Sequence, residues 1–228
     1  MELLPINLGI VRTSGNAQIA EKSGQQMQEL RPKILERDNH TCRFCGFHSQ
    51  KYQEVVFLNG NGEDLRVDNL ATACIFCHQC FDLDRASQMN SGVLVWLPEI
   101  EQAELNHIAR AIYVARISQG SMADTARAAL DSLMARREDA KTRMATDDPF
   151  FLATVFRDFL GPKHYAAREQ KLKGVRLFPL DRRNITEGDL KFNQFPQILA
   201  YWRSKDGPFG NNPPSGWKML YAKMKQAA

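Results

Sequence analysis

The sequence of 228 residues contains no long hydrophobic run and no internal repeat. A helix needs about 20 consecutive apolar residues to cross a bilayer, and the most apolar stretch, SGVLVWLPEI, is far shorter. The opening MELLPINLGIVRTSG also lacks the basic segment and long apolar stretch of a secretion signal. We therefore expect a cytoplasmic protein without a transmembrane segment. With 43% hydrophobic and 25% charged residues, disorder over the whole chain is excluded.

A large excess of charge of either sign is also missing, since the formal net charge is only +4. Such a mildly basic chain tolerates contact with nucleic acid or with an acidic protein surface but requires neither. Composition alone therefore leaves the function open.

Cysteine is scarce, but four of the five cysteines form two Cys-x-x-Cys pairs: Cys42 with Cys45, and Cys74 with Cys77. In a reducing compartment this pattern indicates a metal site and argues against disulfides. Two such pairs supply the four thiolates of a closed structural site, so we predict one structural Zn²⁺. Redox dithiols and an iron–sulfur centre are the alternatives. Cys80 is expected to be a small buried residue and no ligand.

The sequence around the cysteines predicts an α+β fold. A helix over QQMQELRPKILERDNH leads to the first pair, and EVVFL should pair with DLRV through an NGNG turn. CHQCFDLDRASQMN reads as one helix. After residue 92, four helices are predicted: one opened by Pro98, one over 122–144, one over 148–160 and a last short one over WKMLYAKMKQ.

We divide the chain into three parts. Residues 1–92 form the zinc-binding module with an N-terminal extension, 93–160 a helical part, and 161–228 a loop-rich segment that is first basic and then rich in Pro, Gly and aromatic residues. The aromatic residues of this last segment are expected to serve packing, and the segment is a candidate for ordering only against a partner.

The stretches ILERDNHTCRFCG and VDNLATACIFCHQC resemble the zinc-bearing HNH nuclease family over roughly residues 31–85. The resemblance implies an HNH-like ββα zinc module and, in active members, a separate catalytic magnesium beside the hairpin. Glu54, Asn69 and His78 match the family's acidic, Asn and post-cysteine positions. The position of the catalytic histidine, however, is occupied by Val55.

Phosphodiester hydrolysis needs a group that takes a proton from water and a cation that holds the developing charge. Valine does neither, so we expect no catalytic residues and no enzymatic activity. His40 and His48 are possible substitutes for the missing base, but both belong to the first cysteine region and are expected to be surface or supporting residues, one of them donating towards a cysteine sulfur.

The stretch LPINLGIVRTSGNAQIAEKSGQQ, together with the Val55-bearing segment, resembles the IcmJ (DotN) family of the Dot/Icm type IV secretion system over most of the chain. The resemblance implies a non-catalytic adaptor for protein transport in virulence, held at the cytoplasmic face of the inner membrane. The implied partners are the C-terminal extension of the coupling ATPase DotL and the IcmS/IcmW chaperone pair. No small-molecule substrate is implied, and contact with the membrane would be indirect.

Two other functions stay open at this point. One is a divergent HNH-type nuclease that depends on a metal. The other is a non-catalytic nucleic-acid-binding protein, suggested by the basic run over residues 163–183, although interleaved acids such as Glu169 and Asp181 favour a solvated surface.

Overall fold

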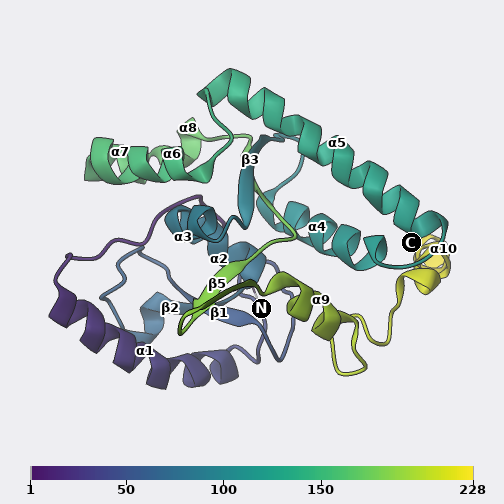
Figure 1. The fold of residues 1–228 in the computed structure, drawn as a ribbon, viewed down its shortest axis with the longest axis horizontal. Helices are drawn as coiled ribbons and strands as arrows, with labels where there is room; N and C mark the ends of the chain where they lie inside the picture. The colour runs from purple at the N-terminus through teal and green to yellow at the C-terminus, as the bar shows by residue number, and fades with distance from the viewer. Residues whose placement is uncertain (1, 228) are drawn as a thin grey trace.

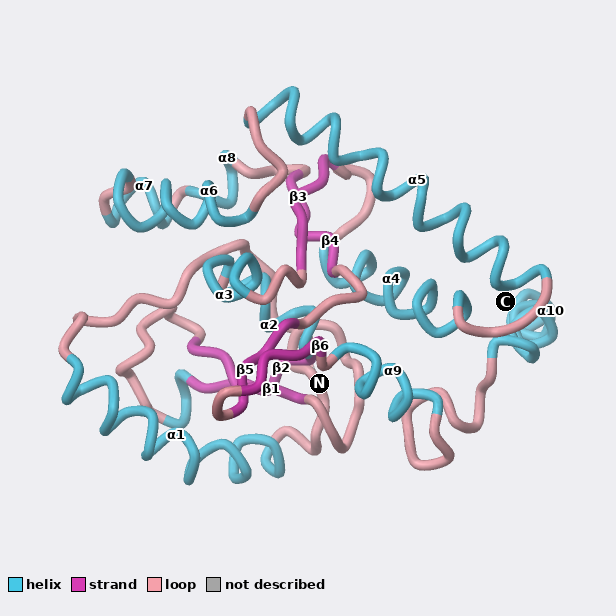
Figure 2. Tube along the Cα trace, viewed as in Figure 1, coloured by secondary structure: helices cyan, strands magenta, loops and turns pink. Residues whose placement is uncertain are grey.

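The computed structural model describes residues 2–227. Helices surround three separate two-stranded antiparallel sheets in this part of the chain (Figures 1 and 2). The helices are α1 (Ala17–Arg37), α2 (Ile75–Phe81), α3 (Leu83–Gln88), α4 (Gln102–Arg116), α5 (Ser121–Met144), α6 (Pro149–Thr154), α7 (Pro162–Ala166), α8 (Arg168–Lys171), α9 (Phe195–Arg203) and α10 (Trp217–Ala227). The strands are β1 (Gln53–Phe57), β2 (Leu70–Cys74), β3 (Gly92–Trp96), β4 (Val175–Pro179), β5 (Asn184–Glu187) and β6 (Leu190–Asn193).

The first hairpin pairs β1 with β2, which places Val55 opposite Thr72. The prediction that DLRV forms the second strand was wrong, because the chain needs a wide loop to return. Asn69 closes this loop: its side-chain oxygen accepts from the Asn59 amide at 3.0 Å, and its side-chain nitrogen donates to the Asp64 carbonyl at 2.8 Å. The buried strand therefore starts only at Leu70.

The helices on either side of this hairpin differ from the predicted ones. α1 begins at Ala17, well before the expected start, because Asn16 caps it by accepting from the amides of Gln18 and Ile19. The expected helix from Cys77 to Asn90 is instead two helices. The helical conformation is interrupted at Asp82. The carboxylate of Asp82 caps α3 by accepting a hydrogen bond from the Arg85 amide at 3.2 Å.

The second sheet joins distant parts of the chain, because β3 pairs with β4 across the boundary predicted at residue 160. Helix α5 packs against β3, and α4 packs against both α5 and β4. The helix predicted to open at Pro98 begins at Gln102, whereas those over 122–144 and 148–160 are confirmed, the latter continuing from α6 into a π-helical turn, Val155–Phe159.

The last third of the chain is more regular than the expected loop-rich tail. It contains β4, the β5–β6 hairpin and the helices α7 to α10. Trp202 and Phe195 of α9 are buried, so these two aromatic residues serve packing as predicted. Among the described residues, no helix combines the length and the apolar character needed to cross a membrane.

One hydrophobic core extends from the cysteine module into the helical part. It contains the four paired cysteines together with Leu105 and Tyr113 of α4 and with Trp202 of α9. The three predicted parts of the chain therefore share their interior.

Candidate metal centre

A tight turn presents the first cysteine pair. The Gly46 amide donates to the Cys42 carbonyl at 2.9 Å, and the Cys42 amide donates to the Phe47 carbonyl at 3.0 Å. Gly46 has a φ of +73°, a conformation that glycine adopts without steric cost. This turn directs both Cys42 and Cys45 to the same side of the backbone.

The second pair lies where β2 ends and α2 begins. Cys74 is the residue before the first turn of α2, and its Sγ accepts from the Cys77 amide at 3.5 Å. Cys77 follows one turn later on the side facing the first pair. A turn and a helix start thus provide two thiols each.

The four thiols form a single cluster. The sulfur atoms of Cys42, Cys45, Cys74 and Cys77 lie within 4.8 Å of one another, and all four residues are buried. Four thiolate sulfurs at such separations fit the tetrahedral donor set of a closed zinc site. The structure therefore brings together all four predicted ligands, and the cluster is able to hold a metal ion, whose identity remains a prediction.

The electrostatics of the cluster favour a cation. Burial and the neighbouring thiols of Cys45 and Cys74 raise the pKa of the Cys42 thiol, whereas hydrogen bonds from Cys42, Cys74 and Cys77 lower that of Cys45. Without an ion, the buried thiols therefore share protons and do not all ionise. A divalent metal allows all four to be thiolates and displaces those protons.

Helix α4 supplies hydrogen-bond donors to the cluster. Asn106 Nδ2 donates to Cys77 Sγ at 3.3 Å, and an Arg110 guanidinium nitrogen donates to Cys74 Sγ at 3.2 Å. His107 Nε2 lies 2.7 Å from the Cys45 carbonyl oxygen, and hydrogen bonding to Cys45 raises the pKa of His107. Such outer contacts orient metal ligands and tune the charge of the site.

Arg110 is a buried cation held by aromatic rings. Its guanidinium carbon lies 3.8 Å from the ring centroid of Phe47 and 5.4 Å from that of Phe76. Four thiolates around Zn²⁺ carry a net charge of −2, so a buried guanidinium offsets part of the excess. Sequence reasoning missed these α4 donors because nothing in a helical pattern indicates a contact with cysteines far away in the chain.

The remaining cysteine and the two nearby histidines do not join the cluster. Cys80 is fully buried, and its thiol donates to the Phe76 carbonyl at 3.4 Å. His48 Nδ1 lies 3.0 Å from the Asn39 carbonyl oxygen and 3.3 Å from the Thr41 hydroxyl. Donation from a histidine of this region to a cysteine sulfur was therefore the wrong expectation, since Asn106 and Arg110 fill that role.

Three of the positions that match a nuclease centre, Glu54, Val55 and His78, line a separate small cavity, whereas the side chain of Asn69 holds the loop between β1 and β2. A pocket of about 260 Å³ is lined by Glu54, Val55, His78 and Arg85, together with Arg31, Asp82 and several apolar residues. Val55 is buried and lies on β1 as predicted. Burial lowers the pKa of His78 to about 4, so the imidazole is neutral at pH 7, and its Nδ1 has no hydrogen-bond partner.

Glu54, one of the two acidic residues that line this pocket, is held by two arginines. Nη2 of Arg183, from the segment before β5, lies 2.7 Å from Glu54 Oε1. Nη2 of Arg31, from α1, lies 3.4 Å from Glu54 Oε2. Burial alone would raise the pKa of Glu54, but positive charges lower it: that of His78 only while its imidazole is protonated, and those of Arg183 and Arg31 at all ordinary pH values. The carboxylate therefore stays ionised at pH 7, where the two guanidinium groups are its charged partners. Its charge is therefore already balanced by guanidinium groups.

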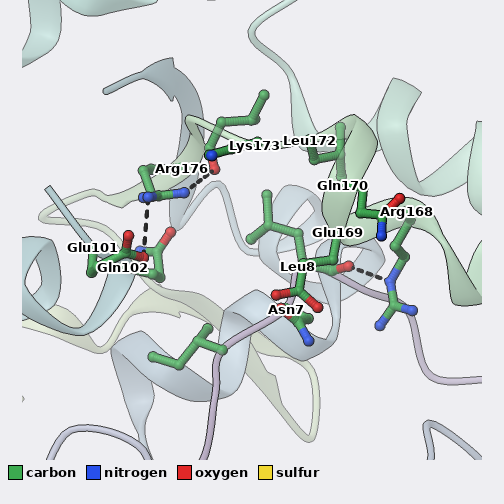
Figure 3. Close-up of a pocket in the computed structure, with 12 residues that line it drawn as sticks. Asn7, Leu8, Glu101, Gln102, Arg168, Glu169, Gln170, Leu172, Lys173 and Arg176 are labelled. Atoms are coloured by element: carbon green, nitrogen blue, oxygen red, sulfur yellow. Dashed lines mark hydrogen bonds and ion pairs between the residues drawn. The ribbon is translucent and has the colours of Figure 1, made fainter. Parts of the chain in front are cut away.

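A further cavity among the described residues lies away from both places. It has a volume of about 410 Å³ and lies between the N-terminal segment, the start of α4, and the α8 to β4 region (Figure 3). Arg176 pairs with Glu101 at 3.2 Å, and Arg168 Nε donates to the Leu8 carbonyl at 2.7 Å (Figure 3). Both arginines are therefore bound by other groups of the protein.

Together these features define a mixed helical and β protein in which a cysteine module capable of holding a metal is built into the main core. No family model matches the chain. The chain is 33% identical over 164 residues to the type 4 apparatus protein DotN of Legionella pneumophila, an alignment that covers 70% of this chain and 76% of the relative. The chain belongs to the DotN (IcmJ) family, as the resemblance predicted.

Proposed function

We propose that this protein is a non-catalytic adaptor subunit of a type IV secretion coupling complex. In this role it binds the C-terminal extension of the coupling ATPase DotL, works beside the IcmS/IcmW chaperone pair and helps to recruit effector proteins at the cytoplasmic face of the inner membrane. Its relationship to DotN, a type 4 apparatus protein, is the observation that carries the proposal.

The pocket around Val55 supports a role without catalysis. We propose that the β1–β2 hairpin and α2 are an HNH-like ββα unit whose base has been replaced by Val55. Glu54 is paired with Arg183 and Arg31, so placing Mg²⁺ there would require breaking two ion pairs. A buried valine and a neutralised carboxylate provide neither the base nor the cation site that hydrolysis needs.

We propose that the four-cysteine cluster holds one Zn²⁺ as a structural element of the adaptor. The cluster is buried, and Arg110 and Asn106 of α4 donate to its sulfurs. Four cysteine ligands fill all the positions of a tetrahedral zinc ion, as in structural sites, and leave none for a substrate. Zinc then connects the hairpin module to α4, and so to the surfaces of the helical part that are available to partners.

Co-purification tests the adaptor role. The chain is co-expressed with DotL and IcmS/IcmW, and the ATPase is captured. We expect the chain to co-purify with full-length DotL and to be lost when the DotL C-terminal extension is deleted, which is the matched control. Equal recovery with the truncated ATPase, or no recovery with the full-length one, would contradict the proposal.

The nucleic-acid alternatives are tested on the purified protein. Binding to duplex DNA is measured at two salt concentrations, because contacts to phosphates weaken steeply with salt. We expect no salt-sensitive binding and no magnesium-dependent nicking of a plasmid. Either activity would favour the divergent nuclease or the nucleic-acid-binding protein over the adaptor.

A further inference from the structure

Helix α10 lies at one edge of the molecule (Figure 1). Trp217 anchors its start: the indole nitrogen donates to the Asn212 carbonyl at 2.8 Å, and the ring centroid lies 6.2 Å from that of Phe209. The residues from Lys218 to Lys225 are all exposed. The helix is therefore fixed at its start and faces solvent from Lys218 to Lys225.

The exposed side of α10 includes an apolar face. Leu220, Tyr221 and Met224 are 46%, 62% and 63% exposed. Residues three and four apart share one side of a helix, so these side chains continue the side on which Trp217 lies. Neighbouring large apolar residues that stay exposed mark an interaction surface, whereas isolated ones are ordinary.

Lysines flank this face on both sides. At 100° per residue, Lys218 and Lys225 lie along one border of the apolar face and Lys223 along the other. The helix contains no acidic residue, and these three lysines take part in none of the ion pairs found among residues 2–227. Their charge is not offset within the helix.

We propose that α10 lies on an anionic lipid surface. Lysines at both borders of an apolar face suit a helix lying in the plane of a membrane, because their stems follow the acyl region while their ammonium groups reach the phosphates. The uncompensated positive charge complements anionic headgroups. This contact would add a direct membrane attachment to the indirect one expected through the coupling complex, and it does not depend on the ATPase.

Vesicle sedimentation tests this proposal on the full-length, zinc-loaded protein alone. The probes are vesicles of phosphatidylcholine and vesicles that contain in addition about one third phosphatidylglycerol, at low and high salt. We expect binding only to the anionic vesicles and weaker binding at high salt, because salt screens the attraction. Binding to neither vesicle, or equal binding to both, would overturn the proposal.

Two variants separate the charge from the apolar face. The charge variant, Lys218→Gln with Lys223→Gln and Lys225→Gln, should bind anionic vesicles about a hundredfold more weakly. The apolar variant, Leu220→Ser with Met224→Ser, should also lose binding, although its charge is unchanged. Far-UV circular dichroism checks that both remain folded.

A matched control removes three exposed lysines elsewhere in the chain, through Lys22→Gln, Lys163→Gln and Lys191→Gln. It should retain the vesicle affinity of the wild type, since only the lysines beside the apolar face contribute. An equal loss in this control would reduce the effect to net charge and overturn the proposal. Capture of α10 by soluble polyglutamate while anionic vesicles fail to bind would assign the helix to an acidic protein partner instead.

Discussion

At the scale of single residues, buried charges explain how the metal module is attached to the rest of the protein. Arg110 reaches from α4 to Cys74 Sγ, and Asp38 accepts from the Thr72 amide at 2.9 Å at the other side of the hairpin. Glu54 is held by Arg183 across a sequence separation of 129 residues. Arg110 and Arg183 thus join the cysteine region to distant segments, whereas Asp38 ties two parts of that region to each other.

Arg110→Met should weaken zinc binding by about 10–100-fold, because it removes a donor and a compensating charge while keeping an apolar stem. Competition with a chromogenic chelator measures the affinity. Arg116→Met is the matched control on the same helix, since Arg116 pairs with Asp181 and not with a cysteine. Unchanged zinc affinity in Arg110→Met would show that the guanidinium does not support the metal.

Val55→His alone should not confer nuclease activity, because Glu54 stays paired with Arg183 and Arg31. Plasmid nicking with Mg²⁺ measures the activity, and wild-type protein purified in parallel is the control. Plasmid nicking by pure wild-type protein would contradict the proposal that the protein has no nuclease activity.

Asp38→Asn should lower the free energy of unfolding by about 2–3 kcal/mol, since it removes charge-assisted hydrogen bonds in the interior. Burial would raise the pKa of Asp38, but hydrogen bonds from Arg37 and Thr72 lower it below its usual value of 3.8. A carboxyl group with a lowered pKa stabilises the fold fully above its ordinary pKa and loses that contribution as the pH falls towards its folded value.

The cost of Asp38→Asn should therefore be constant from pH 8 to 5 and shrink only below about pH 4. Urea unfolding of both proteins across this range measures the difference. A cost that disappears already near pH 6 would show that another group is responsible.

At the scale of the elements, the sequence predicted helices better than pairings. The helix over 122–144 was predictable because its apolar stripe repeats at helical spacing, and α5 runs from Ser121 to Met144. The β1–β2 pairing was missed because NGNG suggested a tight turn, whereas Asn69 stabilises a wide loop. β4 was missed because it lies in a basic segment and is defined by its distant partner, β3.

At the candidate metal site, the sequence likewise revealed the local pattern but not the contacts made by distant residues. Local spacing identified Cys42, Cys45, Cys74 and Cys77, which the fold brings together. Their supporting contacts depend on how α4 docks on the module, so no local pattern could reveal Asn106 or Arg110. The arginines that bind Glu54 were also unpredictable, because they come from α1 and from the segment before β5.

Gly174, just before β4, lies close to the Trp96 ring, and this contact predicts the effect of a substitution there. Gly174 has a φ of +89°, and a Cβ atom there would lie 2.8 Å from the Trp96 ring. Gly174→Ala should lower the free energy of unfolding by about 2 kcal/mol or more, because it adds both backbone strain and a clash.

Gly24→Ala is the matched control for Gly174→Ala. Gly24 lies within α1, and a Cβ atom there would meet no neighbour within 4 Å. Alanine should therefore stabilise α1 by about 0.5–1 kcal/mol. Thermal or urea unfolding measures the change in the free energy of unfolding, which should be negative for Gly174→Ala and positive for Gly24→Ala. No change in Gly174→Ala would contradict the close packing of Gly174 against Trp96.

At the scale of the whole molecule, the cysteine cluster belongs to the main core and not to an appendage. The paired cysteines share that core with residues of α4 and α9. Free energies of zinc binding in zinc-finger peptides are about 10–16 kcal/mol, more than the net stability of most domains. Zinc bound here would thus determine whether the surfaces of the helical part form at all.

The central claim is that four sulfurs hold one zinc ion in this core. Metal analysis combined with X-ray absorption of the purified protein tests it most directly, with Cys77→Ser and Cys80→Ser as a matched pair. The account predicts one zinc per chain, coordinated by four sulfurs at about 2.3 Å, retained in Cys80→Ser and lost in Cys77→Ser. Protein that is folded without a tightly bound metal, or zinc retained in Cys77→Ser, would contradict it.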